Sequence, residues 1–510
     1  MRLPDDFSPF RLSFATRVWL AIGCVLHGVV GVSVGLSVDE AHYALYAMHL
    51  DWSYFDHPPL VGWVQWPLVA AGAPEWFMRL LPQMLWLLTA LLVHALALRL
   101  QPHVESGTRA AARLHAGDWA VAVFALTPVF HVLGIGLLPD TLLMALGCAV
   151  MWVVLDLRDP GALSRWGLWM ALGLSLGLAG LSKYTAILWA VAAAFCLLGW
   201  HGVRVLMRPG LWLAVLLAAA CIAPVLVWNA QNQWMSFAYQ LQHGKGGAWQ
   251  AEPVLRFAML QLVVYGPLML WAAAGARPSG SSKSMLLAFF AMPFAVLALT
   301  SAGGTSLPHW TAPAWACLVP FVGVGLVEAN RPSARKSRLQ SSLMVLQALA
   351  CVVLLGTMVT AGQPFLRQDS GQGNRAQPSN PFADLHGWET AGVRASELAA
   401  QRGLSSVSVQ NWTLASRIAW YARPLPVHVL EDRFDQFALW AGPLAVGEST
   451  LLLDWSQLGY AVPLGSHGFT ECTLLDTVQV SRMGATIATF RFYACSGWSG
   501  DPQPRLLADS

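Results

Sequence analysis

Residues 18–40 read VWLAIGCVLHGVVGVSVGLSVDE, a long apolar run that ends abruptly on the two acids Asp39 and Glu40. About 20 consecutive apolar residues are enough to cross a bilayer as a helix. Acids beside such a segment are energetically costly and indicate a functional site by default. This stretch therefore predicts a membrane protein that carries out chemistry at the boundary between lipid and water.

The composition of the whole chain agrees with this reading. Its 510 residues are 56% hydrophobic and 11% charged, with a mean hydropathy of +0.52, whereas soluble domains carry about 25% charged residues. The net charge of +3 is too small to indicate nucleic-acid binding. The 25 Trp residues fit either interfacial belts or aromatic surfaces for sugar or prenyl groups. We expect a polytopic α-helical membrane protein.

The apolar runs and the charged loops between them predict a topology. The first run follows Arg11 and Arg17 and is too long for a cleavable signal, so we expect it to remain as a helix. Basic loops alternate with loops poor in Lys and Arg, which places the N-terminus in the cytoplasm and the C-terminal tail outside. The candidate spans, about eleven in number, are 15–36, 79–99, 118–137, 141–157, 166–182, 184–200, 211–228, 256–275, 285–301, 312–328 and 342–361.

The polar C-terminal part predicts a separate soluble domain. Spans and loops make up a transmembrane domain over 1–361, followed by a Pro- and Gly-containing linker over 362–383 and a small α/β domain over 384–510. Cys472 and Cys495 are an even pair in this polar part, which predicts a disulfide in an oxidising compartment. The expected tail helices are 388–402 and 412–421, and the expected strands are 406–410, 427–430, 450–453, 477–480 and 486–492.

The first outer loop, residues 37–78, contains two acidic turns. Ser37 and Glu40 fit a capping box that starts a short interfacial helix over 41–50. Glu40 then either caps the helix or binds substrate, and Asp39 remains available for chemistry. In the second turn, Pro58 and Pro59 stiffen the chain behind Asp56 and His57, which either contact substrate or form an ordinary loop exit. His42 and His49 lack the tight spacing of a metal site.

Three later outer segments carry further polar candidates. Asp140 follows Pro139 at the start of an apolar run, as a helix cap or a substrate contact. Lys183 and Tyr184 occupy a tight turn, where the lysine is either a snorkelling anchor or a cation that receives a phosphate. His309, after Pro308, is likewise either a structural anchor or a group that binds the phosphate. Because all these residues fall on one side of the predicted topology, we expect a single cleft on the outer face.

These segments resemble a known family. Residues 39–43, DEAHY, and 51–60, DWSYFDHPPL, are similar to the first-loop signature of the dolichyl-phosphate-mannose protein mannosyltransferase superfamily, which includes bacterial aminoarabinose transferases (glycosyltransferase families 39 and 83). Residues 138–140, 183–184 and 308–310 look like its later outer-loop motifs. Residues 385–388, LHGW, resemble a tail motif of bacterial members.

The resemblance implies a C-type glycosyltransferase (GT-C) fold and a sugar donor on a polyprenyl-phosphate carrier. Asp39 matches the family's catalytic acid, and Asp140 matches a further acid of the aminoarabinose transferases. Asp56 and His57 stand where those enzymes have Glu-Lys. The implied acceptor is a hydroxyl group of a lipid such as lipid A, a glycan or a protein.

The chemistry expected from these residues is an inverting sugar transfer at the outer face of a bacterial inner membrane, with the tail in the periplasm. Asp39 would act as general base. Lys183, aided by His57 or His309, would neutralise the departing phosphate. Asp56 and Asp140 would hold sugar hydroxyls or orient these cations. No cofactor is required, although the acids and the phosphate would accommodate a divalent cation.

Two other function classes fit parts of the chain. A transporter or flippase of lipid-linked sugar typically shows internal repeats and acids near the bilayer midplane, whereas no repeat is evident here and the acids lie at a boundary. A membrane scaffold that binds a partner through its tail would leave the cluster of polar residues unexplained.

Overall fold

The computed structural model describes residues 12–101, 115–245, 250–275, 278, 280–301, 307–329, 334–363, 380–458 and 468–502. The chain forms two compact units. The first, called here the membrane unit, comprises Met1–Gly28, His57–Val61 and Arg79–Val352. The second, called the loop–tail unit, comprises Val29–Asp56, Gly62–Met78 and Val353–Ser510, so it joins most of the first outer loop to the tail.

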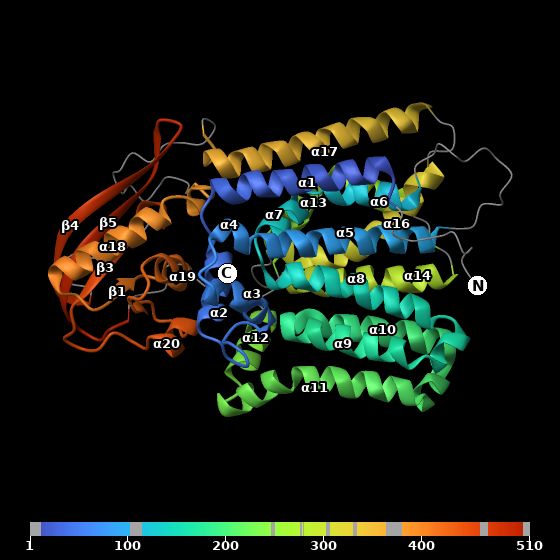
Figure 1. Cartoon of the computed structure of the whole chain (residues 1–510), viewed down its shortest axis with the longest axis horizontal. Helices are drawn as coiled ribbons and strands as arrows, with labels where there is room; N and C mark the ends of the chain where they lie inside the picture. The colour runs from blue at the N-terminus through green and yellow to red at the C-terminus, as the bar shows by residue number, and fades with distance from the viewer. Residues whose placement is uncertain are drawn as a thin grey trace. The chain divides into compact units, whose positions relative to one another are not determined.

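The membrane unit is built of α-helices with short 3₁₀ and π segments (Figure 1). Long apolar helices make up most of its described part, as expected of a polytopic protein. The elements, including α1 and α17 that continue into the loop–tail unit, are α1 (Phe14–Ser33), α5 (Leu80–Leu100), α6 (Ala116–Ala125), α7 (Pro128–Ile135), α8 (Pro139–Leu157), η1 (Pro160–Ser164), α9 (Trp166–Ser182), η2 (Tyr184–Ala186), α10 (Ile187–His201), η3 (Gly202–Met207), α11 (Pro209–Gln231), α12 (Met235–Lys245), α13 (Ala251–Gly275), α14 (Gly280–Leu286), η4 (Leu287–Ala291), α15 (Met292–Ser301), η5 (Pro308–Thr311), α16 (Ala312–Ala329) and α17 (Ala334–Thr360).

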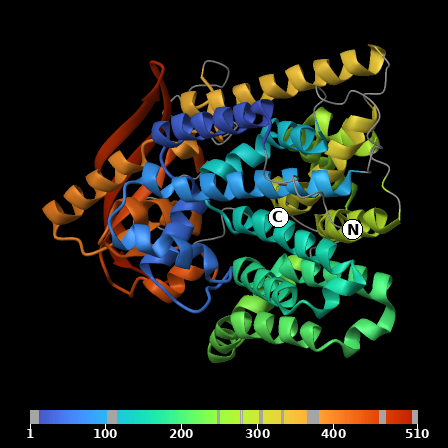
Figure 2. The same ribbon diagram turned by 45° about the vertical axis from the view of Figure 1, so that its right-hand side comes forward.

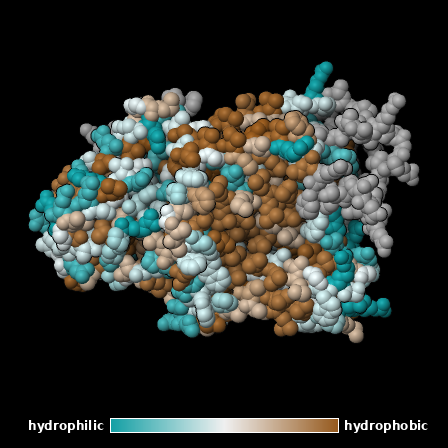
Figure 3. Space-filling view, in the orientation of Figure 1, coloured by the Kyte–Doolittle hydropathy of each residue, from teal (hydrophilic) through white to brown (hydrophobic). Residues whose placement is uncertain are grey.

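Within the described residues, nine helical segments are long and apolar enough to cross a membrane. The expected span over 118–137 is instead two helices, α6 and α7, that meet at 72°. Thr127 lies in the extended region at the bend because Pro128 disfavours helical backbone in the residue before it. The expected span over 166–182 corresponds to α9, which has 17 residues. Hydrophobic side chains gather over the helices of this unit on the face drawn in Figure 3, as lipid contact requires.

Close helix packing in the membrane unit depends on small residues. Helices α9 and α11 run side by side in both ribbon views (Figures 1 and 2). A Cβ added at Gly173 of α9 would lie 2.6 Å from the Ala214 carbonyl oxygen of α11, so a larger residue cannot fit without separating the helices. Small residues at such contacts are typical of membrane helix pairs, where backbones approach closely.

Helix α13 is broken in its middle. Gly266 has φ 78° and ψ 161°, a conformation that side-chain-bearing residues rarely adopt, and Pro267 follows it. The side chain of Gln347 in α17 bridges the break: its Oε1 accepts from Leu268 N at 3.0 Å and its Nε2 donates to Tyr265 O at 3.0 Å. The break brings Tyr265 to η5, where its hydroxyl contacts Pro308 O at 3.0 Å and Thr311 Oγ1 at 2.8 Å.

The loop–tail unit contains a five-stranded mixed sheet in the order β2-β1-β3-β5-β4. Strand β1 pairs in parallel with β2 and β3, while β5 pairs antiparallel with β3 and β4. Its elements are α2 (Val38–Met48), most of α3 (Leu60–Ala70), α4 (Glu75–Met78), η6 (Ala383–Leu385), α18 (Trp388–Arg402), β1 (Val407–Val409), α19 (Trp412–Tyr421), β2 (Val427–Val429), α20 (Gln436–Trp440), β3 (Thr450–Trp455), η7 (Ser456–Leu458), β4 (Phe469–Arg482) and β5 (Ala485–Trp498).

The tail elements lie where the sequence predicts them, with one difference in length. Helices α18 and α19 have the predicted bounds, whereas β4 and β5 are 14-residue strands, much longer than expected. Strand β4 is an edge strand with exposed polar residues such as Glu471 and Thr473, so it lacks the apolar alternation that marks a strand. Of the predicted linker, residues 364–379 lie outside the described part of the chain.

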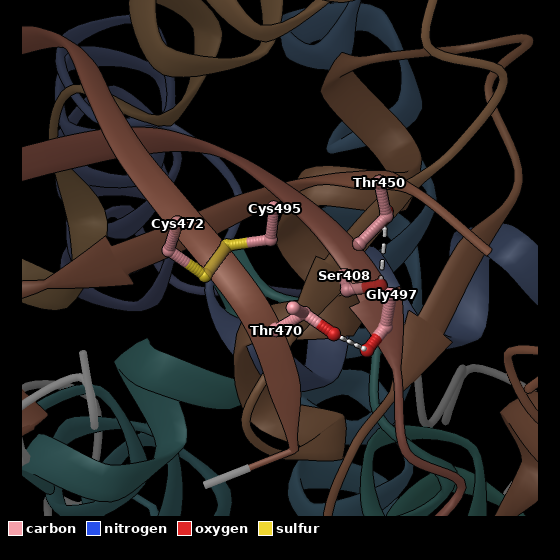
Figure 4. The surroundings of a disulfide bond; sticks show 6 residues. All are labelled: Ser408, Thr450, Thr470, Cys472, Cys495 and Gly497. Atoms are coloured by element: carbon pink, nitrogen blue, oxygen red, sulfur yellow. Dashed lines mark hydrogen bonds between the residues drawn. A yellow bond between two sulfur atoms is a disulfide. The ribbon is translucent and has the colours of Figure 1, made fainter. Parts of the chain in front are cut away.

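A disulfide joins the two long strands. Cys472 of β4 and Cys495 of β5 are bonded, which confirms the predicted pair (Figure 4). Close by, Thr470 Oγ1 donates to Gly497 O at 3.2 Å and fastens the same two strands. The six other cysteines are free thiols, as expected of packing residues in apolar runs.

Candidate functional site

The first acidic turn starts helix α2 with the predicted capping box. Ser37 Oγ accepts from Glu40 N at 3.3 Å, and Glu40 Oε2 accepts from Ser37 N at 3.0 Å. Eight of the eleven residues of α2 are buried, and helix α19 of the tail packs against it. The carboxylate of Glu40 is thus engaged in the cap, which is the structural one of its two predicted roles.

One face of α2 carries the polar side chains that surround Asp39 in sequence. Counted from Asp39, the residues His42, Tyr43 and Tyr46 stand three, four and seven positions further along, so their side chains share a face with Asp39. Helix α19 of the tail packs against α2. This pairing brings residues separated by more than 370 positions in the sequence into contact, for example His42 and Ser416.

Asp39 is half-buried, and its charge interacts with the guanidinium of Arg417 in α19. Arg417 is 1% exposed and lies over the ring of Trp388 at 3.9 Å, with its charge paired to Asp384. Burial lowers the pKa of Arg417, and the charge of Asp39 acts in the opposite direction. A tail residue therefore belongs to the electrostatic surroundings of the predicted catalytic acid. The sequence predicted no such role for the tail.

The second acidic turn is fastened to the same helix. The hydroxyl of Tyr46 donates a hydrogen bond to Asp56 Oδ1, and His42 Nε2 lies 3.5 Å from Asp56 Oδ2. Burial and the neighbouring charge of Asp56 raise the pKa of Tyr46, so its proton stays in place as a donor. Asp56 is therefore oriented by α2 as well as by the stiff chain behind it. His57 belongs to the membrane unit and is half-buried.

The membrane unit contains a buried ion pair between Asp140 and Lys183. Lys183 Nζ donates to Asp140 Oδ1 at 2.8 Å and to Oδ2 at 2.7 Å, and the two residues are 2% and 7% exposed. Asp140 lies in the first turn of α8, and Lys183 follows the last residue of α9. Ser182 Oγ donates to Pro139 O at 2.8 Å and ties these helix ends together. Burial excludes the snorkelling role for Lys183, and pairing shows that Asp140 does more than start a helix.

The short helix η5 contributes two further side chains to this pair. His309 Nε2 lies 3.9 Å from Asp140 Oδ2, and Lys183 Nζ lies 5.4 Å from the ring centroid of Trp310. Tyr184 turns to helix α12, where its hydroxyl hydrogen-bonds with Ser236 Oγ at 2.6 Å. The structure thus brings Asp140, Lys183 and His309 together and gives Tyr184 a different partner.

The candidate residues therefore form two groups, one in each compact unit. Asp39, Glu40 and Asp56 belong to the loop–tail unit, and the other five belong to the membrane unit. The single outer cleft remains a prediction. In the part of the chain that is described, no three His, Cys, Asp or Glu side chains are placed to hold a metal ion.

Sequence reasoning did not assign roles to His42, Tyr46, Arg417 or Trp310. A signal existed for two of them, because His42 and Tyr46 share the helical face of Asp39 at three- and seven-residue spacings. Trp310 is marked in the sequence only as part of residues 308–310, which resemble a family motif. Nothing local marks Arg417, whose role depends on the packing of α19 against α2.

The chain is similar to membrane glycosyltransferases. The model of the family described as dolichyl-phosphate-mannose-protein mannosyltransferase matches residues 56–228, a range that includes Asp56, Asp140 and Lys183. Two crystal structures of ArnT from Cupriavidus metallidurans, one in the apo state and one bound to undecaprenyl phosphate, each superpose with a TM-score of 0.60. They cover 96% of this chain and 99% of theirs, at 17% and 18% identity. The chain has the C-type glycosyltransferase (GT-C) fold.

A curated protein extends the similarity to this GT-C chain. Lipid A galacturonosyltransferase RgtD of Rhizobium johnstonii is 26% identical over 290 residues. The alignment covers 54% of this chain and 58% of RgtD, so the chain spans a little over half the length of that relative. The GT-C fold and the membrane-spanning helices agree with what the first-loop resemblance implied.

Proposed function

We propose that this GT-C protein transfers a sugar from a polyprenyl-phosphate carrier to a hydroxyl group of an acceptor. The buried Asp140–Lys183 pair, with His309 and Trp310 beside it, carries this proposal. Burying two charges costs several kcal/mol, and membrane proteins keep such groups mainly for ion, proton or substrate handling. The similarity to RgtD and to ArnT, which was crystallised with undecaprenyl phosphate, supports a lipid-linked donor.

Lys183 would bind the carrier phosphate. An ammonium group has three donors, and two of those on Lys183 are used by Asp140. The third is available in principle to a phosphate oxygen, in surroundings of low dielectric where charge stabilisation is strongest. His309 would add a second donor when protonated, and the ring of Trp310 would provide an apolar wall.

Asp39 would be the general base. The acceptor hydroxyl attacks the anomeric carbon, its proton passes to the Asp39 carboxylate, and the bond from that carbon to the phosphate oxygen breaks. The carrier phosphate leaves as a stable anion, so no acid needs to protonate it. Attack from the face opposite the phosphate inverts the anomeric centre. A positioned base of this kind typically contributes about 10²–10⁴-fold.

We place the reaction on the outer face of a bacterial inner membrane. The positive-inside pattern supports this orientation, and the Cys472–Cys495 bond supports an oxidising compartment for the tail, such as the periplasm. Hydroxyl groups of lipids, glycans and proteins all suit this chemistry as acceptors. The similarity to RgtD favours a lipid A acceptor.

The decisive experiment measures release of carrier phosphate. Purified protein in lipid nanodiscs is incubated with candidate polyprenyl-phosphate sugars and lipid A, and free polyprenyl phosphate and glycosylated lipid A are followed by mass spectrometry. We expect release that depends on acceptor, with Asp39→Asn inactive. Movement of intact lipid-linked sugar between leaflets in proteoliposomes, without release of carrier phosphate, would show that the protein is a flippase and not a transferase.

A further inference from the structure

The C-terminal end of helix α19 holds the segment that leads into helix α2. The backbone N–H of Leu36 donates to the hydroxyl oxygen of Tyr421 at 2.9 Å. One residue earlier, the backbone N–H of Gly35 donates to the carbonyl oxygen of Leu385 at 2.9 Å. Because a backbone N–H can only donate, both contacts have one possible direction. Two tail residues therefore fix the backbone immediately before the capping box that starts α2.

The same end of α19 also holds the far end of the first outer loop. Trp420 Nε1 donates to Glu75 Oε1 at 3.1 Å, and the Tyr421 hydroxyl hydrogen-bonds to Glu75 as well. Burial raises the pKa of Tyr421, and the charge of Glu75 raises it further, so the hydroxyl keeps its proton. Tyr421 therefore donates to Glu75 while its oxygen accepts from Leu36 N. The loop over 37–78 is thus fastened at both ends to consecutive residues of the tail.

The motif over 385–388, LHGW, keeps the Leu385 carbonyl in place, first through its histidine. Arg482 Nε of β4 donates to His386 Nδ1 at 3.1 Å. Since a guanidinium has no acceptor, Nδ1 must accept, and the proton of the ring lies on Nε2, which donates to Met358 O at 2.9 Å. Burial and then the charge of Arg482 lower the pKa of His386 to about 4, which agrees with a neutral ring. His386 thus ties the motif to β4 and to the end of α17.

The last two residues of the motif are also fixed by their surroundings. Gly387 has φ 85°, where glycine is favoured, and a Cβ there would lie 2.3 Å from Val480 Cγ2. Trp388 is 1% exposed, and its Nε1 donates to Asp384 O at 3.0 Å. A backbone turn held on both sides in this way has little freedom to move the Leu385 carbonyl. The contacts of the motif therefore explain how the tail keeps this acceptor in front of the first loop.

We propose that Tyr421 and the carbonyl group of Leu385 are positioning groups for Asp39. This acid follows Leu36 by three residues and lies in the first turn of α2. The inference rests on the proposed function, in which Asp39 is the general base. A base must lie within hydrogen-bond reach of the proton that it takes, and an error of about 1 Å in such a geometry can cost about 100-fold in rate. Because the backbone before α2 is anchored to the tail, the tail sets where the Asp39 carboxylate lies.

Hydrogen exchange tests the anchoring without any assay of transfer. In the full-length protein in nanodiscs, we expect Tyr421→Phe to speed amide exchange in the peptide that contains Leu36 by about 2- to 10-fold, because the acceptor of this amide is lost. Tyr493→Phe is the control, since Tyr493 of β5 is buried in a separate apolar cluster, and it should leave this peptide unchanged. Equal exchange in the wild-type and Tyr421→Phe proteins would overturn the proposal, whatever the donor sugar proves to be.

Kinetics separate positioning from stability. With a polyprenyl-phosphate sugar that the wild-type protein turns over, Tyr421→Phe should lower kcat of the folded protein about 10- to 100-fold and leave the donor KM nearly unchanged, because the base acts in the chemical step. A lower unfolding temperature with wild-type kcat would make Tyr421 merely structural and refute the proposal. A wild-type protein that releases carrier phosphate from no donor would instead remove the proposed function, and this inference with it.

A glycine variant tests the same contact from the side of the loop. The φ of Gly35 lies outside the left-handed region, so alanine suits its backbone, but the added Cβ would lie 3.1 Å from the Tyr421 hydroxyl oxygen. Gly35→Ala should therefore shift the start of α2 and lower kcat about tenfold.

The double variant completes this test. In the Tyr421→Phe background the hydroxyl is absent, so Gly35→Ala should lower kcat little further, and the two effects are non-additive. Gly28→Ala is the control, because a Cβ at Gly28 would meet no atom of the described residues within 4 Å, and it should keep the wild-type kcat. Additive losses for Gly35→Ala and Tyr421→Phe would show that the two residues act separately and would contradict the proposal.

Discussion

Two acids, one in each compact unit, are held in contrasting ways. Asp140 in the membrane unit has both carboxylate oxygens on Lys183 and is 2% exposed. The side chain of Asp56 in the loop–tail unit is 23% exposed and is held by a phenol on one oxygen and an imidazole at 3.5 Å from the other. In the first arrangement both carboxylate oxygens are bonded, and both residues lie at helix ends. The second is partly exposed and depends on two side chains of α2, Tyr46 and His42.

The contrast separates two ways of placing charge at a membrane boundary. A carboxylate with both oxygens on a buried lysine is fixed in position, because breaking the pair strands a buried ion. A carboxylate held by one phenol and by an imidazole at 3.5 Å is oriented by the side chains of a single helix, α2. The predictions below test this contrast, starting with the largest expected effect.

Removing one partner of the buried pair should cause the largest loss. Lys183→Ala leaves Asp140 charged and buried, which costs about 3–5 kcal/mol in the free energy of unfolding, and it removes the proposed phosphate ligand. Thermal unfolding in detergent and the carrier-release assay measure both effects. The Asp140→Leu/Lys183→Met double variant is the control: it should recover most of the stability and none of the activity. Wild-type stability in Lys183→Ala would contradict a tight ion pair.

Asp39→Asn should abolish transfer without weakening the fold. The amide keeps the size of the carboxylate but cannot accept the acceptor's proton, so we expect kcat to fall about 10²–10⁴-fold. Donor binding, measured by ligand-induced thermal stabilisation, should remain. If the variant turns over at the wild-type rate, Asp39 is not the base.

The stability of the loop–tail unit should fall as pH rises from about 4 to about 6. Burial raises the pKa of Asp435 to about 6, above the value of about 3.9 expected in an unfolded chain. The folded state therefore binds the extra proton in this range, and its advantage is lost as pH rises, by on the order of 2–3 kcal/mol. Unfolding of the wild-type and Asp435→Asn proteins over this range gives the difference.

Asp435→Asn should remove this contribution and keep the cap of α20, because the amide oxygen can still accept from Phe437 N, which lies 2.8 Å from Asp435 Oδ1. Parallel pH profiles for the two proteins would show that Asp435 does not titrate in this range. His386 contributes with the opposite sign, since burial lowers its pKa to about 4. For this reason only the difference between the two proteins is informative.

Tyr184→Phe should have the smallest effect. It removes one hydrogen bond, to Ser236 Oγ at 2.6 Å, which is worth about 0.5–1.5 kcal/mol. We expect KM and kcat to stay within a few-fold of wild type in the carrier-release assay. A loss that approaches that of Asp39→Asn would give Tyr184 a direct role in substrate binding.

Much of the fold could be predicted from local patterns. Each predicted span corresponds to a helix or a bent helix pair, because a membrane crossing needs a continuous apolar stretch. The capping box at Ser37 and the bounds of α19 were equally readable, since capping and helical periodicity involve residues three or four positions apart. The bend before Pro128 also has a local cause, because proline disfavours helical backbone in the residue before it.

The contacts within the candidate site could not be predicted from local patterns. Asp140 and Lys183 are 43 residues apart, and His42 and Ser416 are 374 apart, so no periodic pattern connects them. Their pairing depends on which helix faces pack together and on how buried each group becomes. Residue types and spacing thus identified acids, a lysine and histidines suited to sugar transfer. Packing determined that Lys183 neutralises Asp140 and that the tail supplies Arg417 and Ser416 to the first loop, because charge pairing and burial are properties of contacts in space.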